Sequence, residues 1–316
     1  MTRLLACVTF VLVAAGLTVG RAQSTQQQPT YRGGAETVRV YATVLDKQGR
    51  LVTSLTREQF EIRDDGKPQP IVVFDNAPQP IQLVVLLDVS GSMAGNLNLM
   101  RNGSKKLFAE LGPDDVARVG TFGREVLISE EFTRDVKALE AALPDHIPQS
   151  APTPLWRAID EAMDVFDTKS DRRRVVLVLS DGKDSDMTFG KRIVSQAEII
   201  DRARDNDVMI YAVGIRSRRG PGMSMYASPA AAMAADLPDP GLALTAEESG
   251  GGYAEVMPRE DLGAAFAQIA RELHSQYLLG YEPPKRDGKT HKIEVRVSAR
   301  GVEPRARKSY VAPKER

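Results

Sequence analysis

Three uninterrupted apolar runs constrain the fold of this chain more than any other feature. Residues 83–87 read Leu-Val-Val-Leu-Leu, residues 175–179 read Val-Val-Leu-Val-Leu, and residues 208–215 form a third run. Short continuous runs of this kind are typical of strands that are buried on both faces of a parallel sheet. The rest of the chain must therefore cover both faces of such a sheet.

Helical patterns alternate with these runs along the sequence. We expect helices at residues 97–111, 155–166, 193–204 and 262–273, and further strands at 116–122, 126–129 and 253–256. This alternation predicts an α/β fold, in which a doubly wound and mostly parallel sheet carries helices on both faces. The Gly- and Pro-containing stretch at residues 216–240 is expected to be a long loop.

The segments on either side of this region have a different pattern. Residues 38–44 and 60–63 alternate apolar and polar side chains, and Asp65-Gly66 is a strong hairpin turn signal. Residues 292–298 repeat the alternation near the C-terminus. Because lone strands need a sheet to join, we expect the N- and C-terminal segments to form one small β-sandwich into which the α/β domain is inserted.

The first residues have the pattern of a secretory signal. Arg3 precedes an apolar run at residues 4–19, and the next residues suit cleavage. The protein is therefore expected to be exported to the periplasm or the medium, with an uncleaved N-terminal anchor as the alternative. The expected division is a signal peptide at 1–22, a disordered leader at 23–35, sandwich parts at 36–79 and 277–316, and the α/β domain at 80–276.

Charge and cysteine content exclude several kinds of partner and chemistry. The 42 Lys and Arg residues balance 42 Asp and Glu residues, so the net charge of +0 gives no general attraction to nucleic acid or to anionic membranes. We expect no nucleic-acid partner and no membrane insertion once the signal is cleaved. The only cysteine, Cys7, lies in the signal, so the mature chain has no disulfide and no thiol nucleophile. The run at 172–174 is expected to be a solvated cap on the N-terminal edge of the sheet.

Oxygen-bearing side chains gather where the ligand site of an open α/β sheet is expected, beyond the C-terminal ends of its strands. Asp88, Ser90 and Ser92 follow the first buried strand within Asp-Val-Ser-Gly-Ser. Thr153 lies in the loop before a helix, and Asp181 follows the second buried strand within Ser-Asp-Gly-Lys-Asp. Together these five residues offer two carboxylates and three hydroxyls at one edge.

This donor set predicts a divalent cation, Mg²⁺ or Mn²⁺. Mg²⁺ takes oxygen ligands in octahedral geometry at about 2.1 Å and keeps several waters, so it needs few protein ligands. The hydroxyls of Ser90, Ser92 and Thr153 can bind directly or through water, while Asp88 and Asp181 supply charge and orient the waters. Neutral direct ligands leave the cation electron-poor, so an outside carboxylate from a protein partner would fill a coordination position left to solvent.

The set Asp88-Val-Ser90-Gly-Ser92, Thr153 and Asp181 resembles the metal-ion-dependent adhesion site of von Willebrand factor type A domains. The resemblance covers residues 80 to about 276, and the flanking segments are similar to a bacterial subfamily of exported type A-related proteins. It implies a doubly wound fold, divalent cation binding and ligand capture in protein interaction or adhesion at the cell envelope. In the family a glycine often precedes the threonine, whereas Pro152 and Pro154 bracket Thr153 here, so the position of Thr153 depends on that loop.

Two other functions compete with this interpretation. A metal-dependent hydrolase would use the ion to activate water, but the motif holds no His or Glu as a general base, and the three histidines of the chain are far apart in sequence. An envelope scaffold with a vestigial metal site would need none of the five residues. We expect a non-enzymatic binding protein with no catalytic residues.

Overall fold

A computed structural model describes residues 37–148, 150–181, 184, 185, 192–216, 238–257 and 260–315. The expected signal peptide, the expected leader and nearly all of the expected 216–240 loop lie outside the described residues. No helix in the described part of the chain is long and apolar enough to cross a membrane.

A six-stranded sheet forms the centre of the α/β region, in the order β10-β9-β8-β5-β6-β7. All its neighbours pair in parallel except β7, which is antiparallel to β6. The strands are β5 (Ile81–Asp88), β6 (Val116–Phe122), β7 (Val126–Ile128), β8 (Arg173–Ser180), β9 (Val208–Ile215) and β10 (Tyr253–Val256). Every residue of β5 and β9 is buried, which confirms the prediction from the apolar runs.

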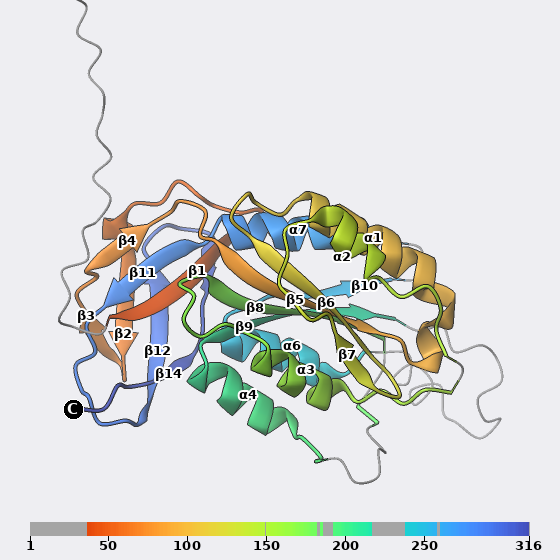
Figure 1. Ribbon diagram of the computed structural model, residues 1–316. Coiled ribbons are helices and arrows are strands. Elements are labelled where there is room, and N and C mark those ends of the chain that lie inside the picture. The colour runs from red at the N-terminus through yellow and green to blue at the C-terminus, as the bar shows by residue number, and fades with distance from the viewer. Residues whose placement is uncertain are drawn as a thin grey trace, which may run out of the picture. The chain divides into compact units, whose positions relative to one another are not determined.

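Helices cover both faces of this sheet (Figure 1). One face packs against α1 (Leu97–Ala109), α2 (Val136–Ala141) and α7 (Leu262–His274). The other packs against α3 (Leu155–Asp164), α4 (Gln196–Asp205) and α6 (Pro240–Ser249). The four predicted helices are confirmed within a few residues of their expected ends, and the doubly wound fold is confirmed with them.

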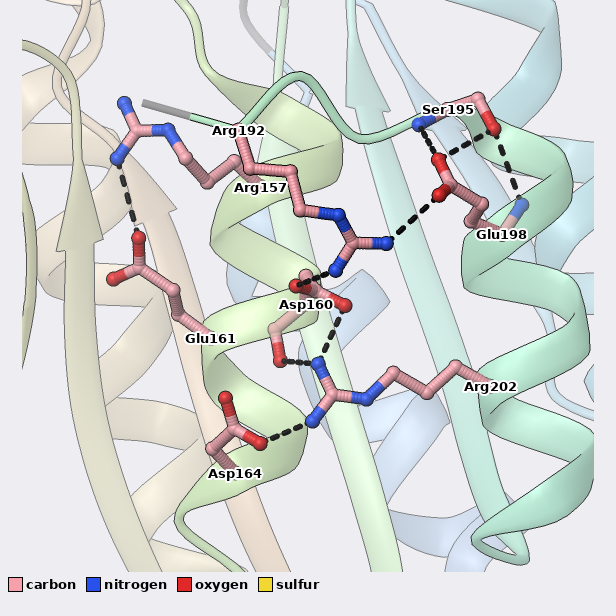
Figure 2. A network of polar contacts seen from close by, with 8 residues as sticks. All are labelled: Arg157, Asp160, Glu161, Asp164, Arg192, Ser195, Glu198 and Arg202. Atoms are coloured by element: carbon pink, nitrogen blue, oxygen red, sulfur yellow. Dashed lines mark hydrogen bonds and ion pairs between the residues drawn. The ribbon is translucent and has the colours of Figure 1, made fainter. Parts of the chain in front are cut away.

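Helices α3 and α4 are held together by an ion network on their outer surface (Figure 2). Arg202 of α4 donates to the carboxylates of Asp160 and Asp164 on α3. Arg192 binds Glu198 at 2.7 Å, and Glu198 also completes a capping box with Ser195 at the start of α4. The Ser195 backbone N–H and the Arg192 guanidinium lower the pKa of Glu198 to about 2. The network fixes the start of α4 against α3.

The terminal segments form two four-stranded antiparallel sheets, in the orders β13-β1-β11-β4 and β14-β12-β2-β3. The N-terminal strands are β1 (Val38–Asp46), β2 (Phe60–Asp64), β3 (Lys67–Gln69) and β4 (Val73–Asp75). The C-terminal strands are β11 (Tyr277–Tyr281), β12 (Thr290–Val297), β13 (Val302–Arg305) and β14 (Ser309–Val311). Apolar side chains of both segments share one core. The predicted sandwich of N- and C-terminal strands is confirmed.

A buried polar network joins strands of both segments inside this sandwich. The Asp64 carboxylate accepts from the hydroxyls of Tyr281 at 2.9 Å and Tyr310 at 2.6 Å, and its other oxygen lies 2.8 Å from His291 Nδ1. Asp287 accepts at 3.2 Å from His291 Nε2. Burial favours the neutral imidazole, but the Asp64 and Asp287 carboxylates outweigh it and raise the pKa of His291 above its usual value. The network therefore depends on a protonated histidine.

The N-terminal edge of the parallel sheet packs against the sandwich, and one prediction is wrong there. Arg173 is not solvated but buried, with its guanidinium 4.7 Å from the centre of the Tyr41 ring. It donates to the Gln276 side chain and to the Leu273 carbonyl. Gln276 in turn donates to Thr43 of β1 at 2.8 Å. The sandwich covers this edge, so the arginine cannot reach solvent as an isolated sheet would allow.

Removing a side chain from the centre of the sheet should destabilise the whole protein. Leu177 is fully buried in β8, so Leu177→Ala should lower the free energy of unfolding by about 2–5 kcal/mol through lost burial and a cavity. Leu127→Ala is the control, because Leu127 is 60% exposed and its loss should change stability by about 0.5 kcal/mol or less. Urea unfolding of both variants measures the difference; equal losses would contradict the described core.

The sandwich network should weaken as the pH rises. Because the folded pKa of His291 is raised above its usual value of 6.5, its protonated form adds stability that is complete below that pH. This stability is lost as the pH rises through the higher folded value. The stability advantage of wild type over His291→Gln should therefore shrink as the pH rises from 6.5 into the alkaline range in urea unfolding. An advantage that stays constant over that range would rule out a protonated His291.

Candidate metal centre

Three segments meet beyond the C-terminal ends of β5 and β8. The chain leaves β5 at Asp88 and enters the short helix η2 (Gly91–Asn96) with Ser90 as its N-cap residue. A Cβ added at Gly91 would lie 2.9 Å from the backbone nitrogen of Ser150, so the 150–154 loop passes directly over this turn. Only glycine leaves room for that approach.

Hydrogen bonds connect four of the five predicted site residues. The Ser90 N–H donates to Asp88 Oδ1 at 2.7 Å, and the Ser90 and Ser92 hydroxyls are 3.1 Å apart. The Ser92 hydroxyl donates to Asp181 Oδ1 at 2.8 Å. Ser180, which the sequence did not single out, donates to Asp88 Oδ2 at 2.5 Å. Two carboxylates and two hydroxyls from segments about ninety positions apart thus form one oxygen cluster.

Thr153 is brought to the same edge but not into this chain of hydrogen bonds. Its N–H donates to the Ser185 hydroxyl at 3.1 Å, and its carbonyl accepts from the Ser185 N–H at 2.9 Å. The side chain is buried, and within the described residues no hydrogen bond links its hydroxyl to the other four site residues. The loop that carries Thr153 is therefore anchored to the segment after β8 by backbone contacts.

Asp184 has a different role from the cluster. Its carboxylate accepts from the Trp156 N–H at 3.3 Å, in the first turn of α3. Trp156 itself is buried and lies against Gly241 of α6. This contact ties the segment after β8 to the start of α3.

The electrostatics of the cluster suit a divalent cation. Asp88 is fully buried, and burial raises the pKa of its carboxyl to about 6 against the hydrogen bonds from Ser180 and Ser90. The nearby negative charge of Asp181 raises it further. Two buried carboxylates so close together are costly without a counter-charge. A hard cation removes that cost, and every donor in the cluster is a hard oxygen, so the residues fit Mg²⁺ or Mn²⁺.

An apolar groove of about 440 Å³ begins at the same turn. Val89, between Asp88 and Ser90, forms one end, and Val119 and Leu127 of β6 and β7 line it further along. Residues 142–148 form its opposite wall, which Arg101 of α1 holds by donating to the Leu143 and Pro144 carbonyls. Hydrogen bonds therefore hold part of the groove in place next to the cluster.

A second group of metal-ligand types lies in the sandwich. The ligand atoms of Asp64, Asp65 and His291 are within 4.8 Å of one another. The hydrogen bonds of Asp64 to Tyr281, Tyr310 and His291 already satisfy it without an ion. His291 is buried among these partners. We treat this group as part of the sandwich core.

Comparisons with known proteins agree with the geometry. The family model of the von Willebrand factor type A domain matches residues 82–242. No curated protein matches the chain. Similar solved structures include an aerotolerance-related membrane protein from Bacteroides fragilis, with 15% identity, a TM-score of 0.46, and coverage of 61% of this chain and 98% of that one.

Two further solved structures are similar over other shares of the chain. A von Willebrand factor type A protein from Catenulispora acidiphila has 12% identity and a TM-score of 0.44, covering 90% of this chain and 76% of its own. Proximal thread matrix protein 1 from the mussel byssus, with a zinc-occupied MIDAS motif, has 16% identity and a TM-score of 0.46. The match covers 67% of this chain and 50% of the mussel protein.

In the metal-free protein, the buried Asp88 carboxyl should make the folded state less stable as the pH rises. Its folded pKa of about 6 lies above the usual 3.8, so the folded state holds a proton that the unfolded chain has released. The stability of wild type relative to Asp88→Asn should therefore fall as the pH rises from 4 to 6, by up to about 3 kcal/mol. Urea unfolding in chelator measures it.

Adding Mg²⁺ should reverse this trend, because the ion binds the ionised carboxylate. The stabilisation of wild type by Mg²⁺ should grow over the same pH interval, and Asp88→Asn should show little of it. An Mg²⁺ effect that is the same at pH 4 and pH 6 would contradict the assignment.

Proposed function

Because the chain belongs to the von Willebrand factor type A domain family, we propose that it binds Mg²⁺ or Mn²⁺ through Asp88, Ser90, Ser92, Thr153 and Asp181, and that the bound ion captures an acidic side chain of a protein partner. The observation that carries the proposal is the hydrogen-bond chain joining Asp88, Ser90, Ser92 and Asp181 around two buried carboxylates. The bound ion would supply a positive centre with a coordination position open to the partner.

Each residue has a distinct part in this proposal. Ser90, which is buried, and Ser92, which is exposed, offer neutral oxygens, and the buried Asp88 and Asp181 carboxylates supply the charge. Ser180 orients the Asp88 carboxylate by donating a hydrogen bond to it. Thr153 joins the ligands through its hydroxyl, on a loop that Ser185 and Gly91 keep beside the turn.

We favour binding over hydrolysis because of the groups that contact the cluster. The hydrogen bonds of Asp88, Ser90 and Ser92 run to hydroxyls, a backbone N–H and the Asp181 carboxylate, which are the oxygen donors of a cation site. Against a vestigial site stands the cost of the cluster itself. Asp88 is fully buried, and its charged form is costly there for a scaffold that has no use for it.

The groove beside the turn extends the proposed contact. A single carboxylate on an ion gives little specificity, and a protein partner needs apolar area as well. Val89 and Leu127 offer that area in the groove that begins at the cluster, with Leu127 60% exposed. A partner segment that carries an acidic residue next to apolar residues would fill both features together.

We further propose where the protein acts and how it is divided. The pattern of residues 1–22 supports export as a cleaved signal, with the mature protein in the periplasm or the medium. Residues 80–276 would then present the metal site, while 36–79 and 277–316 close the sandwich at the opposite edge of the sheet. We propose no nucleic-acid partner, because the net charge is +0.

Cation binding tests the site directly. Ser92→Ala removes one oxygen from an exposed position, so the fold should survive while Mg²⁺ affinity in calorimetric titration falls about tenfold or more. Asp181→Asn should weaken binding more strongly, because it removes charge. Ser54→Ala, an exposed serine in the sandwich, is the matched control and should bind Mg²⁺ like wild type. Equal affinity in wild type, Ser92→Ala and Asp181→Asn would overturn the metal site.

A separate measurement tests the partner and the absence of catalysis. Proteins captured from an envelope extract in Mg²⁺, released by chelator and not captured by Asp181→Asn are the expected partners. Changing the partner's acidic residue to its amide should then abolish binding. Turnover of a phosphoester or peptide substrate that chelator abolishes would instead support a hydrolase.

A further inference from the structure

A pocket of about 190 Å³ lies at the N-terminal edge of the parallel sheet, the edge opposite the metal centre. We call it the arginine pocket. Its walls are residues 168–172 before β8, Arg173 and Arg174 at the start of β8, Arg39 and Tyr41 of β1, and Asp207 before β9. Strands of the sandwich and loops of the α/β region thus both contribute to it.

The arginine pocket gathers positive charge without matching carboxylates. Five of its side chains are basic, and none of them forms an ion pair within the part of the chain that the structure describes: Arg39, Lys169, Arg172, Arg173 and Arg174. Of its two acidic residues, Asp207 is already paired with Arg307 at 2.6 Å. Asp171 alone remains to balance five cations.

The excess of positive over negative side chains matters most at Arg173, because Arg173 is buried. Its partners are the Gln276 amide oxygen, the Leu273 carbonyl and the Tyr41 ring, all of them neutral. The Nε atoms of Arg173 and Arg174 are buried and have no hydrogen-bond partner among the described residues. The Asp115 and Asp207 carboxylates act on this charge only from beyond ion-pair distance, since Asp115 is bound to His274 and Asp207 to Arg307. A buried guanidinium without a contacting carboxylate is costly, and charged hydrogen bonds left unmade add to the cost.

The neighbouring Arg172 and Arg174 also lack a contacting carboxylate among the described residues. Arg172 donates to the Asp114 carbonyl and Arg174 to the Asn206 carbonyl, so these guanidiniums are held in place by neutral groups with donors to spare. Guanidinium groups match the geometry of phosphate oxygens in pairs, and lysine adds a mobile point charge. The Thr168 and Ser170 side chains add hydroxyls to the lining.

We propose that the arginine pocket binds a phosphate-type oxyanion, held chiefly by Arg39, Lys169 and Arg173. The volume of the arginine pocket limits the size of its ligand. The pocket has room for about six waters at about 30 Å³ each, and it is smaller than the roughly 300–1,000 Å³ of a drug-sized site. The pocket therefore accepts inorganic phosphate or one phosphate group of a larger molecule. The proposal is independent of the metal centre.

Titration with inorganic phosphate tests this site on the full chain. Calorimetry in chloride buffer at low ionic strength should show saturable binding to wild type, weakened at least tenfold in the double variant Arg39→Gln/Lys169→Gln. Both side chains are at least partly exposed, so the fold should survive. The matched control, Lys289→Gln/Arg300→Gln, removes the same charges from exposed positions of the sandwich and should bind phosphate like wild type.

A second arm distinguishes the source of the phosphate. Vesicles of phosphatidylcholine with phosphatidic acid present the group on a lipid, and vesicles of phosphatidylcholine alone are the blank. Binding to these anionic vesicles that only the pocket variant loses would support recognition of a phosphate on a larger molecule, even where free phosphate binds weakly. No binding to either probe, or equal loss in pocket and control variants, would overturn the proposal.

Discussion

Strands β5, β8 and β9 have protein on both faces, and this double burial governs where polar chemistry can occur in the molecule. Inside such strands a polar side chain must find a partner or be excluded, because burial without a hydrogen bond is costly. Polar side chains accordingly lie at the strand ends. Gln82 exchanges hydrogen bonds with the Asp167 backbone at one end of β5, and Asp88 accepts from Ser180 at the other.

The two ends of the sheet have opposite chemistry. Carboxylates and hydroxyls meet at the C-terminal edge, where Asp88 and Asp181 lie in the cluster that we propose binds a cation. Guanidiniums meet at the N-terminal edge, where Arg173 has neutral partners only among the described contacts. In both places an apolar sheet between two helical layers leaves little water to screen the charge, so each edge favours a ligand of the opposite sign.

Sequence patterns predicted the parts of the fold that depend on local periodicity. The apolar runs predicted β5, β8 and β9. The short motif after β5 predicted that Asp88, Ser90 and Ser92 gather at one edge of the sheet. Patterns failed where contacts are long-range. Helix α6 begins Pro-Gly, which breaks the helical pattern; Asp239 caps it, and its apolar residues pack on β9. The solvation of Arg173 could not be judged, because Tyr41 and Gln276, which bury it, are far away in sequence.

The joining of both chain ends in one sandwich has a consequence for the order of folding during synthesis. Gln276 contacts Thr43, which lies 233 positions earlier, and the strands that pair with β1 are β11 and β13. Such distant pairing closes slowly, after the intervening region has formed its own nearer contacts. Until β11 has been made, β1 has an open edge and the apolar side chains of Val38, Val40 and Ala42 lack their core. The first strand of the described chain is thus the last to be protected, and during synthesis it is open to wrong partners for longest.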